Sequence, residues 1–226
     1  MCGRYTITVT LEELLLHYWI SDSNAPYQQP KYNVAPGQMV LAVIHDGEKN
    51  RLGELKWGLV PSWAETTKLA AKMINARSET VWEKPAFRKL MERKRCVIPA
   101  DGFYEWRQEE GRKQPMRIVR RDRKLFSMAG LYDTWISPDG VKLSTCTVLT
   151  TAPNELMEPI HNRMPVILRP EDEATWLDRS ERDNATLNRL LRPFPSELLE
   201  AYPVGAQVGS VAKDDESCIA PLASNG

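Results

Sequence analysis

Residues 96–151 read CVIPADGFYEWRQEEGRKQPMRIVRRDRKLFSMAGLYDTWISPDGVKLSTCTVLTT, and this stretch decides the fold. Four segments rich in β-branched, aromatic and other apolar residues follow one another in it, at residues 96–108, 114–120, 124–135 and 142–151. The turn-forming sequences EEGRK, RDRK and SPDG separate them. Because strands that follow one another through short turns pair antiparallel, the stretch predicts three or four antiparallel strands.

The flanking sequence predicts short helices around this sheet. Thr10 and Glu13 have the spacing of a capping box at the start of a helix, and Pro85 lies near the first turn of a basic helix. A further strand enters a hairpin at Asp46 and Gly47. Two or three more short helices are predicted, at residues 170–178, 183–191 and 195–201. Strands and helices do not alternate regularly, so the predicted class is α+β, a single domain over residues 1–226 with a curved, partly barrel-like antiparallel sheet flanked by short helices.

Composition narrows the class of protein. The chain has 226 residues, 42% of them hydrophobic and 27% charged, which is typical of a soluble globular protein. No apolar run approaches the roughly 20 residues that a membrane span needs. Glu12 and Glu13 lie where a signal peptide would be apolar. Four cysteines without CxxC spacing argue against a disulfide framework or a structural zinc site. We therefore expect a cytoplasmic protein with no membrane partner and no metal.

Charge is unevenly distributed although the formal net charge is zero. Residues 84–124 hold 14 Lys and Arg against 6 Asp and Glu, whereas residues 171–226 hold 11 acidic and 5 basic residues. Such a polarised surface could bind a phosphate backbone on one face. The basic residues could equally be solvated turns between strands, so charge alone leaves both interpretations open.

Cys2 follows the initiator methionine directly. If Met1 is removed, the chain begins with an amine of pKa ~7.7–8.0 and a thiol of pKa ~8.5 on adjacent carbons, both nucleophilic near neutrality. An aldehyde reacts with such a 1,2-aminothiol first at the amine, giving a Schiff base, and then at the thiol, giving a five-membered thiazolidine. Cysteine at position 2 can also be no more than a chain start.

Two further residue types suit proton transfer. In DGFYEWR, extended geometry puts Phe103, Glu105 and Arg107 on one face of a strand and the intervening aromatic residues on the other. A carboxylate among aromatic side chains loses hydration, which raises its pKa towards neutrality; alternatively Glu105 forms an ordinary surface ion pair with Arg107 or Arg117. His161 lies in the polar loop EPIHNRMP, where an imidazole can transfer protons or serve only the structure.

Other candidates suit a nucleic-acid ligand. In MINARSE, Asn75 and Arg77 lie on one face of an extended segment, and an amide beside a guanidinium fits a phosphate or a base edge. Trp63 could stack on an unpaired base or belong to the core. The motifs GxGxxG, GxxxxGK[ST], HExxH and GxSxG do not occur, so nucleotide-binding, zinc-peptidase and serine-hydrolase functions have no support.

Eight strings occur in a fixed order: CGRY, KYNVAP, WGLVPSW, INARSET, CVIPADGFYEW, AGLYDTW, IHNRMPVIL and YPV. Over residues 2–204 the sequence resembles the SOS-response-associated peptidase (SRAP) family, the abasic-site processing proteins. The resemblance implies a groove for single-stranded DNA, a monomeric protein and no cofactor. It also implies a thiazolidine between Cys2 and the ring-opened aldehyde of an abasic site, and removal of the protein's own Met1, a peptidase activity.

The same resemblance implies roles for individual residues. Asn75 positions the sugar, Glu105 handles protons on the terminal amine, and His161 acts as acid or base on the opened sugar. The implied DNA contacts are Arg4, Arg77 and Trp63. The sequence departs from the family pattern at Asn162, where Asp is expected, and at residues 208–218, which are less basic than expected.

Two other functions remain open from the sequence. One is a thiol peptidase acting on peptides in trans, with Cys2 as nucleophile, His161 as base and Asn75 or Glu105 as the orienting group. The other is a module that binds single strands without covalent chemistry, through Arg77, Trp63 and residues 84–124.

Overall fold

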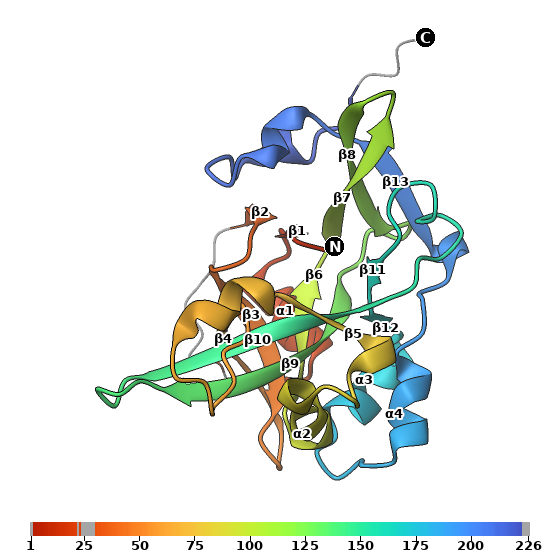
Figure 1. The fold of residues 1–226 in the computed structure, drawn as a ribbon. Helices are drawn as coiled ribbons and strands as arrows, with labels where there is room; N and C mark the ends of the chain where they lie inside the picture. The colour runs from red at the N-terminus through yellow and green to blue at the C-terminus, as the bar shows by residue number, and fades with distance from the viewer. Residues whose placement is uncertain (1, 22, 24–29, 223–226) are drawn as a thin grey trace.

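The computed structural model describes residues 2–21, 23 and 30–222. Its strands form two sheets (Figure 1). They are β1 Tyr5–Ile7, β2 Lys31–Val34, β3 Met39–His45, β4 Asn50–Trp57, β5 Asn75–Arg77, β6 Arg95–Ala100, β7 Gly102–Glu109, β8 Arg112–Arg120, β9 Phe126–Ile136, β10 Lys142–Thr151, β11 Met164–Pro165, β12 Ile167–Leu168 and β13 Leu199–Pro203. The helices are α1 Leu11–His17, α2 Pro85–Arg93, α3 Pro170–Leu177 and α4 Asn184–Leu190, with 3-10 turns at η1 Thr67–Lys72, η2 Ser78–Thr80, η3 Ser196–Leu198, η4 Ala206–Gly209 and η5 Glu216–Cys218.

The larger sheet closes on itself. Strands pair in the order β10-β4-β3-β6-β9, and β9 pairs back onto β10 as an antiparallel hairpin. Strand β10 runs parallel to β4 and to β5, while the other pairs around the barrel are antiparallel. The predicted α+β class with a partly barrel-like sheet is therefore confirmed, and the two parallel pairs make the barrel mixed.

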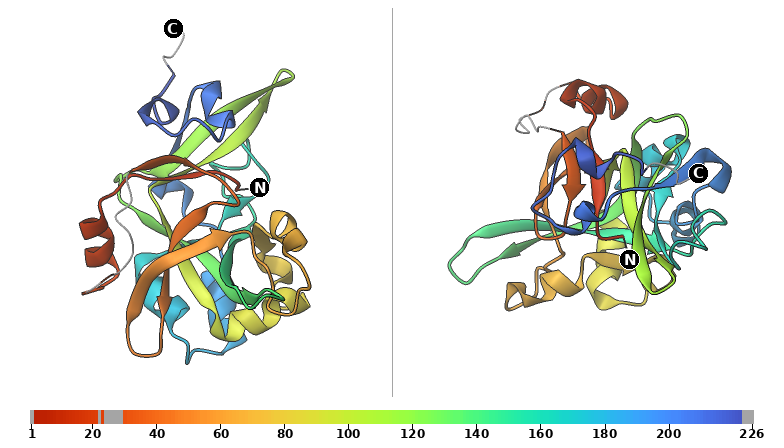
Figure 2. Two further views of the ribbon diagram at one scale, coloured as in Figure 1. Left: turned by 90° about the vertical axis from the view of Figure 1, so that its left-hand side faces the viewer. Right: turned by 90° about the horizontal axis from the view of Figure 1, so that it is seen from above.

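The second sheet has the order β13-β8-β7-β1-β2 and is antiparallel throughout. Strand β7 follows β6 after a single residue, Asp101, so the chain passes directly from barrel to second sheet. The main hydrophobic cluster includes Val97 of the barrel together with Phe103 and Ile118 of the second sheet. Figure 2 shows the long β7–β8 hairpin rising beyond the barrel, with α2, α3 and α4 around the barrel's other end.

Most of the predicted flanking elements form where the sequence signals lie. At α1, Thr10 accepts a hydrogen bond from the Glu13 amide at 3.2 Å, and the Glu13 carboxylate accepts one from the Thr10 amide at 2.7 Å. Helix α2 begins at Pro85, and Asp46 caps the β3–β4 turn by accepting bonds from two backbone amides.

The helix predicted over residues 195–201 is wrong. Only the turn η3 forms there, and the chain continues as β13, which pairs antiparallel with β8 from Leu199↔Arg120 to Pro203↔Met116. The free edge of β8 provides a backbone ladder that local helix propensity cannot offset.

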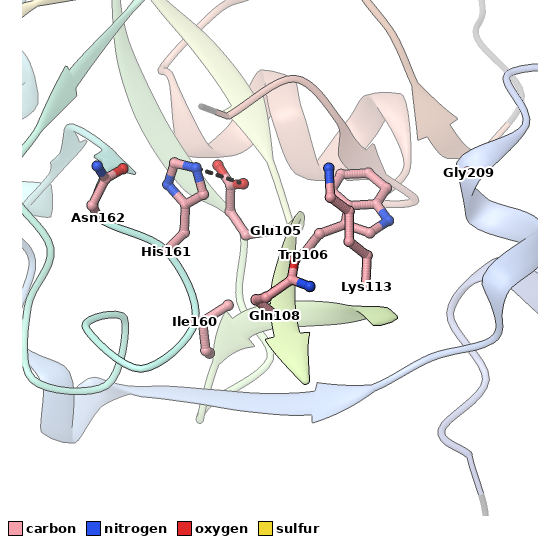
Figure 3. A pocket seen from close by; sticks show the side chains of 8 residues that line it. All are labelled: Glu105, Trp106, Gln108, Lys113, Ile160, His161, Asn162 and Gly209. Atoms are coloured by element: carbon pink, nitrogen blue, oxygen red, sulfur yellow. Dashed lines mark ion pairs between the residues drawn. The ribbon is translucent and has the colours of Figure 1, made fainter. Parts of the chain in front are cut away.

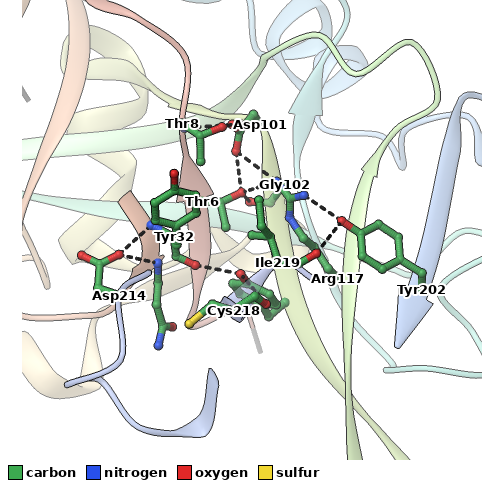
Figure 4. A network of polar contacts seen from close by, with 12 residues as sticks. Thr6, Thr8, Tyr32, Asp101, Gly102, Arg117, Tyr202, Asp214, Cys218 and Ile219 are labelled. Carbon is green, nitrogen blue, oxygen red and sulfur yellow. Dashed lines mark hydrogen bonds and ion pairs between the residues drawn. The ribbon is translucent and has the colours of Figure 1, made fainter. Parts of the chain in front are cut away.

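The C-terminal segment after β13, residues 204–221, returns across the second sheet. Asp214 accepts bonds from the amides of Tyr32 and Asn33 at 2.6 and 3.0 Å, and the Tyr104 hydroxyl donates to the carbonyl of Cys218 at 3.3 Å (Figure 4). The side-chain amide of Asn33 donates to three backbone carbonyls of the segment. Because these bonds join residues between 114 and 182 positions apart, the segment is part of the packed structure.

Candidate functional site

Strand β1 brings Cys2 to the middle of β7. Tyr5 pairs with Phe103, and the Tyr104 amide donates to the Arg4 carbonyl at 2.9 Å. Continued antiparallel, this register carries Cys2 towards Glu105 and Trp106. The Cys2 side chain is buried, and burial followed by the nearby Glu105 carboxylate raises the pKa of its thiol. The thiol is therefore protonated near neutrality and needs a base to become a nucleophile.

Glu105 is a buried carboxyl, with only 2% of its surface exposed. Burial raises its pKa to about 7. The two arginines considered as surface partners are engaged elsewhere, because Arg107 pairs with Glu109 and Arg117 lies 3.5 Å from Asp101. The structure thus favours the desolvated carboxyl over the surface ion pair, and a group with this pKa can both accept and donate a proton at neutral pH.

His161 reaches the same place from the loop between β10 and β11. Its Nε2 lies 3.9 Å from Glu105 Oε2 (Figure 3). Burial lowers the pKa of the imidazole, while burial raises that of Glu105. Both shifts favour the neutral forms, so near neutral pH this contact is a close approach of two proton-transfer groups more than a salt bridge.

Glu105 and His161 line a cavity of about 630 Å³. Its other lining residues are Trp106, Gln108, Lys113, Ile160, Asn162 and Gly209. Figure 3 shows Glu105 beside the imidazole of His161, with Lys113 and Gln108 on the β7–β8 hairpin nearby. Gln108, Lys113 and Gly209 were not predicted as site residues. The register Gln108↔Lys113 across the hairpin could have indicated the first two.

Asn75 and Arg77 lie on β5, which pairs with β10 through Val148↔Asn75 and Thr150↔Arg77. Ala76 between them is buried in the core, as the extended geometry predicted. Both polar atoms of the Asn75 amide are buried and have no hydrogen-bond partner among the described residues. An amide left unpaired costs about 1–3 kcal/mol, which suits a group held for a ligand. Arg77 is exposed.

Trp63 lies apart from the cavity residues, in the loop before η1. Its side chain is 65% exposed, so the core alternative is wrong. Buried Asp133 holds this loop by accepting a hydrogen bond from the Ser62 amide at 2.7 Å. It also accepts one from Lys94 Nζ at 2.6 Å. An exposed ring on an anchored loop has the properties of a stacking platform.

Arg4 is engaged within the protein. Its guanidinium donates to Asn33 Oδ1 at 3.0 Å and to the carbonyls of Val208 and Gly209 at 2.6 and 3.0 Å. Because Gly209 lines the cavity, Arg4 holds the C-terminal segment at the cavity rim. No carboxylate neutralises this arginine in the described structure, so its charge remains available near the site.

The basic stretch 84–124 is not a continuous surface. Arg95 is buried and donates to the carbonyls of Met91 and Trp176, and Arg117 is buried against Thr6 and Asp101. Among the described residues, no group of three or more His, Cys, Asp or Glu is arranged to hold a metal. No helix in the described ranges has the length and apolar character that crossing a bilayer requires.

Comparison with known proteins identifies the family. The model of the family "SOS response associated peptidase (SRAP)" matches residues 1–211. The chain is 49% identical over 213 residues to the abasic site processing protein YoqW of Bacillus subtilis, covering 93% of this chain and 95% of the relative. It is 34% identical to the abasic site processing protein HMCES of Gallus gallus, covering 98% of this chain and 78% of the relative.

A solved structure agrees with these matches. A protein from Bacteroides thetaiotaomicron superposes with a TM-score of 0.85 at 28% identity, covering 98% of this chain and all of the other. The chain belongs to the SRAP family, the family of the abasic site processing proteins.

Proposed function

We propose that the protein captures abasic sites in single-stranded DNA covalently, through Cys2, whose α-amine is freed by the loss of Met1. Two contacts support the proposal: Glu105 acts electrostatically on the Cys2 thiol, and the same carboxyl lines a cavity together with His161. The names of its relatives, abasic site processing proteins, support the choice of substrate.

The reaction needs two bonds at one carbon. The Cys2 amine attacks the aldehyde of the ring-opened sugar, and loss of water leaves a C=N bond. The thiol then adds across that bond: sulfur bonds to carbon, and the thiol proton passes to nitrogen. Glu105, with a pKa near 7, accepts the proton released by the amine and returns it to the departing water.

Neighbouring residues complete the proposed site. His161 promotes sugar ring opening as a neutral acid or base, and the unpaired Asn75 amide binds the sugar. Arg77 and Arg4 contact phosphates, and Trp63 stacks on an unpaired base. Hydrolysis of the Met1–Cys2 peptide bond uses the same proton-transfer groups and frees the amine.

The test uses a single-stranded oligonucleotide with one abasic site, a denaturing gel and intact-mass measurement. We expect an adduct that survives denaturation, absent with undamaged DNA and lost in Cys2→Ala. Cys218→Ala is the matched control, because it removes another buried free cysteine that the proposed reaction does not use. Cross-linking by Cys2→Ala at the wild-type level contradicts the proposal.

The same purified protein also distinguishes the proposed reaction from the two alternative functions, a thiol peptidase and a non-covalent binding module. Blocking the α-amine abolishes the adduct if the aminothiol reacts, whereas a thiol peptidase acting in trans tolerates the block and cleaves peptides. A module that only binds single strands gives complexes that salt dissociates completely. Trp63→Ala weakens binding of undamaged single strands by about 1–3 kcal/mol if the ring stacks on a base.

A further inference from the structure

The backbone of its own loop holds the His161 ring. The Arg163 amide donates to His161 Nδ1 at 3.0 Å, and the Arg163 carbonyl lies farther from the same nitrogen, at 3.3 Å. An Nδ1 that accepts a bond carries no proton, so in the neutral ring the proton is on Nε2. Nε2 is the nitrogen that faces Glu105. Which nitrogen faces the cavity thus depends on where the backbone of residue 163 lies.

The side chain of Arg163 fixes that backbone. Its guanidinium makes a two-pronged contact with Glu79, at 2.6 Å to Oε1 and 2.9 Å to Oε2, and donates to the Thr150 carbonyl at 2.7 Å. Only 14% of the Arg163 side chain is exposed. The hydrogen bonds from Arg163 lower the pKa of Glu79, so the carboxylate is ionised. A paired fork of this kind fixes orientation as well as position.

The partners of Arg163 belong to the turn η2 and to strand β10, which lie beside the loop. Glu79 lies in η2, directly after β5 with Asn75 and Arg77. Thr150 pairs with Arg77 on one side and with Pro165 on the other. Arg163 therefore joins the histidine loop to the strand that carries the two candidate DNA contacts.

We infer that Glu79 and Arg163 form a positioning pair, which sets the orientation and the protonated nitrogen of His161 and keeps that ring in register with Asn75. The effect on adduct formation rests on the proposed function, whereas the effect on the ring does not. Neither residue has to touch DNA for this role. The charged groups around His161 are Glu105, Arg163 and, across the cavity, Lys113.

The test measures the ring directly. Two-bond proton–nitrogen NMR correlations report which imidazole nitrogen carries the proton, and the chain has only three histidines to assign. In wild type we expect a single Nε2-protonated form of His161. In Glu79→Gln we expect a mixture of both forms and an imidazole pKa that moves up, because the released loop is less buried. Glu171→Gln, which alters an exposed Arg169 pair, is the matched control and leaves the ring unchanged.

A second experiment measures how the positioning of His161 affects the rate of adduct formation. Adduct formation by Glu79→Gln should fall between about 10- and 100-fold from misplacement alone, with unchanged affinity for undamaged strands. If Glu79→Gln does not fold, Arg163→Lys keeps the charge and removes the fork. An unchanged tautomer and pKa of His161 in a folded variant overturns the inference. Absence of any adduct from wild type contradicts the proposed function and leaves the NMR result standing.

Discussion

Two buried carboxyl groups stand four residues apart, Asp101 directly before β7 and Glu105 in its middle. Asp101 accepts bonds from the Thr6 hydroxyl at 2.5 Å, the Thr8 amide at 2.8 Å and the Thr8 hydroxyl, with Arg117 at 3.5 Å (Figure 4). Glu105 instead faces a cavity and the neutral ring of His161. The two buried carboxyl groups thus differ in outcome: hydrogen-bond donors make Asp101 a structural tie between β1 and β7, whereas burial raises the pKa of Glu105 towards neutrality.

The largest effect is expected at the structural carboxyl. Asp101→Asn removes the charge that Arg117 faces and leaves donors of Thr6 and Thr8 badly matched. Breaking a buried, hydrogen-bonded ion pair costs about 3–5 kcal/mol. Urea unfolding should show a loss of this size, and Asp122→Asn, at an exposed pair with Arg120, should lose far less. Equal losses of stability in Asp101→Asn and Asp122→Asn would contradict the structural role given to Asp101.

The second prediction concerns Glu105, where removal of the ionisable carboxyl should raise the stability of the protein instead of lowering it. A carboxyl whose pKa is raised on folding binds its proton more tightly in the folded state, so stability falls as pH rises from about 4.5 to about 7. Glu105→Gln cannot ionise and should exceed wild type by up to about 3 kcal/mol at pH 8. The gain should vanish below pH 4.5. A pH-independent difference in melting temperature would show that the carboxyl is not desolvated.

The third prediction concerns the rate at the same residue. If Glu105 accepts a proton, adduct formation rises with pH through about 7, as its carboxyl ionises. Glu105→Gln should be slower by about a hundredfold and lose this inflection. Single-turnover cross-linking between pH 5.5 and 8.5 measures both. Unchanged rates of adduct formation and of Met1 removal exclude Glu105 from the mechanism.

The smallest effect is expected at a donor to Asp101. Thr6→Val keeps the shape of the side chain but removes the hydroxyl, which also accepts a bond from Arg117 at 3.0 Å. We expect a loss of about 1–3 kcal/mol. Combined with Asp101→Asn, the losses should fall short of their sum, because both changes break the same network. Strict additivity would mean that the aspartate and the threonine act separately.

Sequence patterns predicted what local signals determine. The turn sequences EEGRK, RDRK and SPDG fall at strand ends, and the spacing of Thr10 and Glu13 predicted the start of α1. Residues 96–108, predicted as one segment, instead form two strands, β6 and β7, which belong to different sheets. The parallel pairs of β10 could not be predicted, because they join β10 to segments about 70 to 90 residues earlier in the chain. The helix prediction for residues 195–201 failed for the same reason, because these residues pair with the edge of β8, which is distant in the sequence.

The candidate site divides in the same way. Cys2, Glu105 and His161 stand out by chemical type, and the family resemblance assembled them. Asp101 and Glu105 could not be told apart from ADGFYEW, because their difference lies in donors from β1 and β8. Arg163 and Glu79 follow His161 and Arg77 by two residues each, yet only folding brings these pairs together. The roles of all these residues stay predictions until the variants are measured.

The attachment of residues 204–221 to Arg4, Asn33 and Tyr104 matters for choosing where to cut the gene. The family match stops at residue 211, yet Asp214 and Cys218 beyond it accept hydrogen bonds from Tyr32 on β2 and Tyr104 on β7. An expression clone that ended at residue 211 would remove hydrogen-bond acceptors from β2 and β7, the two strands that flank β1, which presents Cys2. Clones should therefore include the chain through residue 222, and tags or reporters should be attached after that residue.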